Sequence, residues 1–242
     1  MPQGATRQST CTRRGSSLSI SRGSGRHLVR RFTQLYVGLL LYGASAALMV
    51  RAGLGLDPWD VFHQGIAERT GLSIGTVAII VGAAVLLLWW PMRERPGLGT
   101  VSNVFLVGLS MDATLWLLPQ VEALAHRVPL LLGGVVLNGA ATGLYISARF
   151  GPGPRDGLMT GLHKITGRSI RLVRTGIEIV VLVTGILLGG SAGVGTVVYA
   201  LAIGPLAQFF LRLFALPDST EPGDASRVVA RGGKQARAVP RR

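Results

Sequence analysis

Residues 53–76 read GLGLDPWDVFHQGIAERTGLSIGT, and 96 positions later residues 149–172 read RFGPGPRDGLMTGLHKITGRSIRL. Each stretch begins with glycine-rich residues that interrupt the chain and continues with a segment of helical composition. Each then reaches a Thr-Gly turn that leads into a long apolar segment. Because the same order of features occurs twice, we interpret the two stretches as copies of one structural unit.

The two copies share the signals that begin and end a helix. DPWD at residues 57–60 places a capping Asp before a Pro at the first helical position, and GPRD at residues 153–156 repeats this with Gly as the cap. Gly71 and Gly167 suit the left-handed conformation that ends a helix. A helix of about a dozen residues is roughly 18 Å long, which is shorter than the hydrocarbon core of a bilayer. We therefore expect a short re-entrant or interfacial helix in each copy.

The rest of the central chain consists of long apolar segments. Of the 242 residues, 48% are apolar, and the segments lack the polar stripe that a soluble helix presents to water. Their lengths are near the roughly 17 to 25 residues that span a membrane. The six segments are residues 32–50, 76–90, 100–118, 129–148, 172–188 and 196–216. The sequence thus predicts an all-α polytopic membrane bundle of six transmembrane helices.

The charged residues lie mostly outside the apolar segments. Residues 1–31 and 217–242 are basic and contain little to bury, so we expect two disordered cytoplasmic tails. Between them we expect one membrane repeat over residues 32–128 and a second over residues 129–216. The net charge of +14 is concentrated toward the ends of the chain, so we expect no nucleic acid partner.

Lysine and arginine counts predict the orientation. With the N-terminus inside, 22 basic residues fall in cytoplasmic regions and three fall outside, at Arg51, Arg69 and Arg127. Cytoplasmic loops retain Lys and Arg preferentially, so both termini are expected in the cytoplasm. Shifting the count by one segment would remove this bias, which also favours six segments.

The duplication extends beyond the two quoted stretches. Residues 35–117 align without a gap on residues 131–213, with 25 identities in 83 positions. Each half contains three apolar segments, and an odd number places the second half upside down in the membrane. The sequence therefore predicts inverted repeats, an arrangement found in many secondary transporters whose site lies near the membrane midplane.

Asp60 and Asp156 are the first candidates for substrate-binding residues. Each lies in the first turn of a short helix, where free N–H groups suit an anion and the carboxylate suits a cation or a proton. The simpler interpretation is that each carboxylate only complements the dipole of its own helix. The other candidate substrate-binding residues are Pro58, Pro154, Trp59, Arg155, His63 and Asp112.

Three of these candidates have alternative explanations. His63 lies one turn after Asp60 and suits a proton relay, but a lone histidine on a polar face is often only solvated. Arg155 stands where the first copy has Trp59, so it pairs with Asp156, holds an anion or marks the cytoplasmic side. Asp112 lies within an apolar segment, where an ionisable group is a functional candidate, or close enough to the outer surface to be hydrated.

No pattern of residues predicts an enzyme. The motifs HExxH, CxxC and the Walker loop are absent, and the four histidines are scattered. Cys11 is the single cysteine, which excludes an intrachain disulfide and a multi-cysteine metal site. We expect no catalytic residues, no cofactor and no metal.

Three strings resemble the YczE-like branch of the YczE/YitT family of bacterial integral membrane proteins. They are RAGLGLDPWDVFHQGIAERTGLSIGT at residues 51–76, RPGLGTVSN at residues 95–103 and GPGPRDGLMTGL at residues 151–162. The likeness covers residues 31–216 and leaves the two basic tails outside. It implies a multi-pass protein of the bacterial plasma membrane and assigns no functional residues.

The leading functional hypothesis is a transporter-like protein that binds or moves a small solute between the two halves. One alternative is a membrane scaffold or regulator that acts through its basic tails and its small-residue packing faces. A second is the substrate-binding subunit of a larger transport complex. The partners that we expect are the lipid bilayer, a small-molecule or ion substrate and a second copy of the chain.

Overall fold

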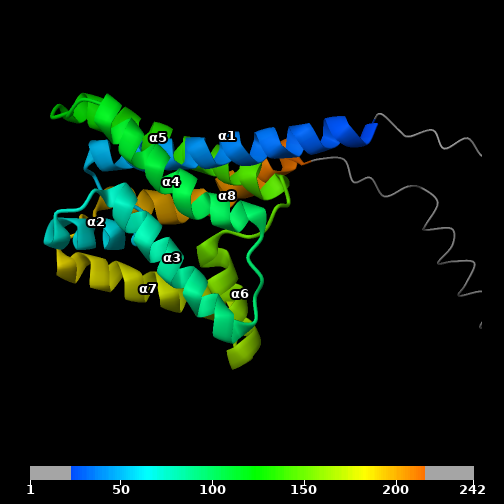
Figure 1. Ribbon diagram of the computed structural model, residues 1–242. Helices are drawn as coiled ribbons and strands as arrows, with labels where there is room; N and C mark the ends of the chain where they lie inside the picture. The colour runs from blue at the N-terminus through cyan, green and yellow to red at the C-terminus, as the bar shows by residue number, and fades with distance from the viewer. Residues whose placement is uncertain (1–22, 216–242) are drawn as a thin grey trace, which may run out of the picture.

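The computed structural model describes residues 23–215. The predicted tails are residues 1–31 and 217–242. Residues 1–22 of the first and all of the second lie outside the described range, whereas residues 23–31 form the start of a helix. The described chain is helical throughout, without a strand (Figure 1). Its helices are α1 (Gly23–Ala52), α2 (Pro58–Thr70), α3 (Ile74–Met92), α4 (Leu98–Leu117), α5 (Leu124–Ser147), α6 (Pro154–Thr166), α7 (Ile170–Leu188) and α8 (Val194–Phe214). The all-α class is confirmed. Helices α1 and α5 begin at Gly23 and Leu124, several residues before the apolar segments that predict them.

Five helices are long and apolar enough to cross a membrane: α1, α3, α4, α5 and α8. Helix α7 has 19 residues, but Arg171, Arg174 and Glu178 lie within it. Large apolar side chains cover the outside of the bundle, including Trp116 and Leu201, which are 85% and 74% exposed. Exposed apolar surface of this extent is stable against lipid and not against water. The chain is therefore a multi-pass membrane protein.

The two short helices form where the sequence predicts them. At α2 the Asp57 carboxylate accepts a hydrogen bond of 2.8 Å from the backbone N–H of Asp60, and Pro58 occupies the first helical position. Both helices have 13 residues and end at a glycine in the left-handed region, with φ of 73° at Gly71 and 66° at Gly167. An L-residue with a side chain would be strained there. Glycine therefore fixes both helix ends.

Helices α1 and α5 pack side by side, with α4 against α1 and α8 against α5 (Figure 1). They run in opposite directions, because the start of each lies at the end of the other. Arg31 donates to the backbone oxygen of Ala148 at the end of α5, and Arg127 donates to that of Ala52 at the end of α1. Each arginine thus satisfies carbonyl groups that a helix end leaves unpaired.

Other contacts join the two halves and exchange partners between them. Helix α2 packs on α7, and α3 packs on α6. The N–H of Gly99 donates to Phe150 at 2.9 Å, and the N–H of Gly195 donates to Leu54 at 2.7 Å. Each bond becomes the other when every residue is shifted by 96 positions.

The contact between α3 and α6 and the contact between α2 and α7 differ in which helix carries the larger side chain. A Cβ atom on Gly157 of α6 would lie 1.9 Å from the ring of Trp89 on α3. At the equivalent place, a Cβ on Gly185 of α7 would lie 2.7 Å from the backbone of Val61 on α2. The larger side chain is therefore Trp89 on α3 in the first contact and Val61 on the short helix α2 in the second.

The described ends of the chain lie at the same end of the bundle. The start of α1 and the end of α8 both appear on the right in Figure 1. The side chain of Gln34 donates to the backbone oxygen of Phe214 at 3.3 Å, which joins the two helices there.

Candidate functional site

The loops before α2 and α6 enter the bundle from opposite ends. Ala52 and Ala148, which precede these loops, are held by Arg127 and Arg31 at the two ends of α1. The 21 residues from Arg31 to Ala52 correspond to about 32 Å of helix. Nevertheless, Arg155 at the start of α6 contacts Asp57 at the start of α2. Each loop therefore returns toward the middle of the bundle, where the two short helices begin.

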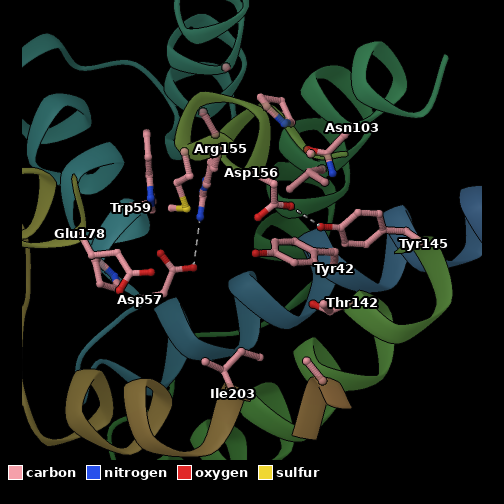
Figure 2. Close-up of a pocket in the computed structure, with 18 of the residues that line it drawn as sticks. Tyr42, Asp57, Trp59, Asn103, Thr142, Tyr145, Arg155, Asp156, Glu178 and Ile203 are labelled. Carbon is pink, nitrogen blue, oxygen red and sulfur yellow. Dashed lines mark hydrogen bonds and ion pairs between the residues drawn. The ribbon is translucent and has the colours of Figure 1, made fainter. Parts of the chain in front are cut away.

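The contact between the short helices is a buried ion pair. Arg155 places Nη1 3.5 Å from Asp57 Oδ2 and Nη2 3.6 Å from Asp60 Oδ1. Figure 2 shows the guanidinium pointing down from α6 toward the carboxylate of Asp57. A single arginine thus joins the two halves through two carboxylates of the opposite half.

A cavity of about 550 Å³ lies beside this ion pair. Tyr42 lines it and stands about midway between Arg31 and Ala52 on α1, which places the cavity at half the depth of the bundle. Val81, Val104 and Ile203 contribute apolar surface. The polar lining consists of Tyr42, Asp57, Trp59, His63, Asn103, Thr142, Tyr145, Arg155, Asp156, Arg174, Glu178, Tyr199 and Gln208.

Trp59 supports the arginine and faces the cavity. The guanidinium carbon of Arg155 lies 4.9 Å from the centre of the Trp59 ring, a cation–π geometry. Trp59 is 6% exposed, and within the described chain its Nε1–H has no hydrogen-bond acceptor. A buried indole N–H normally finds an acceptor. An acceptor for this N–H would come from a molecule in the cavity, water included.

His63 contacts Asp60, the second carboxylate of the ion pair. His63 Nδ1 lies 3.2 Å from Asp60 Oδ1, and both residues are buried. Burial lowers the pKa of His63 although Asp60 opposes this, so the ring is neutral and Nδ1–H donates to the carboxylate. Burial alone would raise the pKa of Asp60, but the contacts with His63 and Arg155 outweigh it and lower the value. His63 therefore keeps Asp60 ionised.

Asp57 has two roles. One carboxylate oxygen caps α2, and the other faces Arg155 and accepts no hydrogen bond from any described residue. Burial and the nearby charge of Asp60 raise the pKa of Asp57 to about 6, although Arg155 opposes this. Asp57 therefore lies within reach of protonation at mildly acidic pH.

Asp156 lies on the other side of Arg155, toward Tyr42 and Tyr145 (Figure 2). Its Oδ2 accepts a hydrogen bond of 3.3 Å from the hydroxyl of Tyr145. No arginine or lysine of residues 28–215 forms an ion pair with it. Glu178, by contrast, is paired with Arg174 at 2.9 Å, as their spacing on α7 predicts.

Most of the predicted site residues converge here. Pro58, Pro154, Trp59, His63, Arg155 and Asp156 line the cavity, and Asp60 lies behind its wall. The predicted pairing of Arg155 with Asp156 does not form, because the guanidinium reaches across to the other half. Asp112 lies elsewhere, accepting hydrogen bonds from Ser73 and from the N–H of Gly75 at the start of α3.

Sequence reasoning treated Asp57 only as a helix cap, and Arg174, Gln208 and Thr142 were not predicted site residues. The signal for Asp57 was its place in DPWD, where an acidic cap stands three residues before a second carboxylate. Tyr42, Asn103, Tyr145 and Tyr199 line the cavity, whereas Asn138 links helices instead.

The described residues contain no group of three or more His, Cys, Asp or Glu side chains placed to hold a metal ion. The site is therefore a chamber of carboxylates, tyrosines and one bridging arginine at the junction of two helix starts.

Comparison with known proteins places the chain in a family. Residues 29–212 match the family described as "Family of unknown function (DUF6198)". The chain belongs to the DUF6198 family. The match covers every described helix except the first residues of α1 and the last two of α8. It leaves out residues 1–28 of the predicted N-terminal tail and the whole predicted C-terminal tail.

Curated relatives of this DUF6198 member come from two bacteria. An "Uncharacterized protein" of Haemophilus influenzae is 41% identical over 75% of this chain and 83% of its own length. The "Uncharacterized membrane protein YczE" of Bacillus subtilis is 33% identical over 76% and 86% of the two chains. The "Uncharacterized protein YyaS" of the same organism is 26% identical over 72% and 89%. No solved structure matches. The resemblance to YczE-like membrane proteins is confirmed.

Proposed function

We propose that this protein is a transporter-like membrane protein that moves a small solute through the cavity between two inverted three-helix repeats. The observation that carries the proposal is the convergence of the two short-helix starts, one from each half, on a polar cavity at half the bundle's depth. Secondary transporters place their sites where interrupted helices of two repeats meet.

Inversion is supported by the reciprocal contacts. Helices α1 and α5 hold corresponding places in the two halves and run in opposite directions. Two bonds, from Gly99 to Phe150 and from Gly195 to Leu54, interchange under the 96-residue shift. A twofold axis in the membrane plane produces this pattern. Each short helix then begins at the midplane and returns to the surface from which its loop entered.

The proposed six membrane spans include α7 in addition to the five long apolar helices. Helix α7 corresponds to α3, and both helices are 19 residues long. Arg171 and Arg174 lie in its first two turns, where long side chains can extend to the interface. Glu178 is paired with Arg174 and faces the cavity. With six spans, the charge bias places both termini in the cytoplasm of a bacterial plasma membrane.

The ion pair supplies a basis for alternating access. Arg155 links α2 to α6 through Asp57 and Asp60 at distances of 3.5 and 3.6 Å, longer than tight charge-assisted hydrogen bonds. Breaking this link would let one short helix separate from the other and open the cavity to one side. The equivalent movement of the second half would open it to the opposite side.

Cysteine accessibility tests this proposal without knowledge of the solute. Ala200 lines the cavity, and the next residue, Leu201, lies on the apolar outer surface. In a Cys11→Ser background, Ala200→Cys should react with a membrane-impermeant thiol reagent in both right-side-out and inside-out vesicles. Leu201→Cys is the matched control and should react in neither.

Reaction of Ala200→Cys from one side alone would contradict alternating access. Equal reaction of both cysteines would contradict the placement of the cavity within the bundle.

A further inference from the structure

The charges around the cavity do not balance. Asp57 and Asp60 share the single guanidinium of Arg155. The pair of Arg174 and Glu178 is neutral by itself. Asp156 accepts a hydrogen bond from Tyr145 and forms no ion pair with another described residue, although Arg171 and Arg174 line a second, smaller pocket with it. With Asp60 counted behind the wall, these ionised groups therefore carry two more negative charges than positive ones. Asp57 and Asp60 are buried, whereas Asp156 is exposed to the cavity. Buried carboxylates are costly without a matching number of cations, so a positively charged ligand in the cavity would offset the excess.

The aromatic lining also favours a cation. Trp59 already holds a cation over its ring face, since the guanidinium of Arg155 lies 4.9 Å from the ring centre. Tyr42 and Tyr145 stand edge to face, with centroids 6.1 Å apart and planes at 80°. In Figure 2 both rings extend toward Asp156. Aromatic rings attract cations, and cages of such rings recognise quaternary ammonium ligands.

An anion fits poorly, although both short helices start at the cavity. At α2 the carboxylate of Asp57 already accepts from the N–H of Asp60. At α6 the carboxylate of Asp156 lies over the first turn, with Oδ2 3.2 Å from the position that a Cβ of Gly153 would take. Each helix start is therefore occupied by a negative charge, which would repel an anion.

A bare metal ion also fits poorly. Calcium takes six to eight oxygen ligands and magnesium six, whereas the described residues offer no cluster of three acidic or histidine groups. The cavity instead has apolar walls, to which Val104, Val107 and Ile203 contribute. Such walls suit the hydrocarbon part of an organic molecule.

We propose that the cavity binds a small organic ammonium ion. Its charged head lies against Asp156 beside the rings of Tyr42 and Tyr145, and its hydrocarbon part lies along Val104 and Ile203. This inference rests on the proposed function, because it names the class of solute that the same cavity takes.

The test uses the purified full chain in detergent micelles and a matched pair of probes. Butylammonium chloride and sodium butyrate have the same four-carbon chain and opposite charges. Thermal unfolding is followed with increasing amounts of each probe at constant ionic strength. The butylammonium ion should raise the unfolding temperature in a saturable manner, and butyrate should not.

Two variants locate the binding. Asp156→Asn should weaken butylammonium binding by about tenfold or more, because it removes the charge that the head group contacts. Glu68→Gln removes the same charge from the exposed end of α2 and should leave binding unchanged. Ala200→Phe, which fills the cavity wall, should also weaken binding and serves if Asp156→Asn does not fold.

Stabilisation by butyrate, no stabilisation by either probe, or unchanged binding after Asp156→Asn would overturn the inference. Flux measurements in vesicles separate it from the proposed function. Butylammonium that binds through Asp156 but does not cross would reject transport and leave the ligand class standing. Butyrate that crosses through an accessible cavity would reject the ligand class and leave transport standing.

Discussion

Replacing Arg155 by methionine removes the guanidinium that faces two buried carboxylates. The side chains of Asp57 and Asp60 are 2% and 4% exposed, and Arg155 itself is 26% exposed. Removing one partner of a buried ion pair costs about 3 to 5 kcal/mol, because a buried charge remains uncompensated. We expect a loss near 3 kcal/mol in the free energy of unfolding, the lower end, since a quarter of the arginine side chain reaches solvent.

Arg174→Met is the matched control. It removes another arginine from the same cavity, but the Arg174 and Glu178 side chains are 58% and 34% exposed. A pair this exposed contributes about 0 to 1 kcal/mol. Denaturant unfolding of both variants in the same micelles measures the difference. Equal losses would refute the assignment of Arg155 as the buried link between α2 and α6.

The pH dependence gives a second check on Arg155→Met. The pKa of Asp57 in the folded protein is already raised to about 6, and losing Arg155 raises it further. The folded variant then binds a proton that the unfolded chain, with an Asp pKa of about 3.9, does not bind at the same pH. Its stability should therefore recover as the pH falls from about 8 to about 5. Asp57→Asn should restore part of the loss at neutral pH, and a deficit that grows on acidification would contradict the explanation.

Two further substitutions test the packing between helices. Gly157→Ala should cost about 1 to 3 kcal/mol, since its Cβ would lie 1.9 Å from the ring of Trp89, whereas Gly176→Ala meets nothing within 4 Å and should be neutral or stabilising in thermal unfolding. Asn138→Ala should cost about 1 to 3 kcal/mol, because it leaves the buried hydroxyl of Tyr199 without its acceptor. Tyr199→Phe should cost less in the same assay. The reverse order would show that Asn138 is not the link between helices.

The short helices could be predicted because their signals are local. A cap, a proline at the first position and a terminal glycine lie within the helix or next to it, and the structure begins and ends α2 and α6 at the predicted residues. The conformation of these residues depends little on what packs around them. Duplication in the sequence then made the second copy as visible as the first.

The chemistry between the halves could not be read in the same way. Whether Arg155 meets Asp156, its neighbour, or Asp57, almost a hundred residues earlier, depends on how α2 and α6 approach each other. The burial of His63 likewise depends on how α2 packs against other helices, which include α3 and α7. The early start of α5 at Leu124 was missed because Pro129 resembles a first-turn proline, whereas it lies inside the helix.

The exchange of side-chain size between Trp89 with Gly157 and Gly185 with Val61 limits how this molecule can evolve. Two copies of the first half alone would press an indole against a valine, and two copies of the second would leave glycine facing glycine with a void between them. The contact surface of each half is therefore complementary to that of the other half. Neither surface would fit a second copy of the same half.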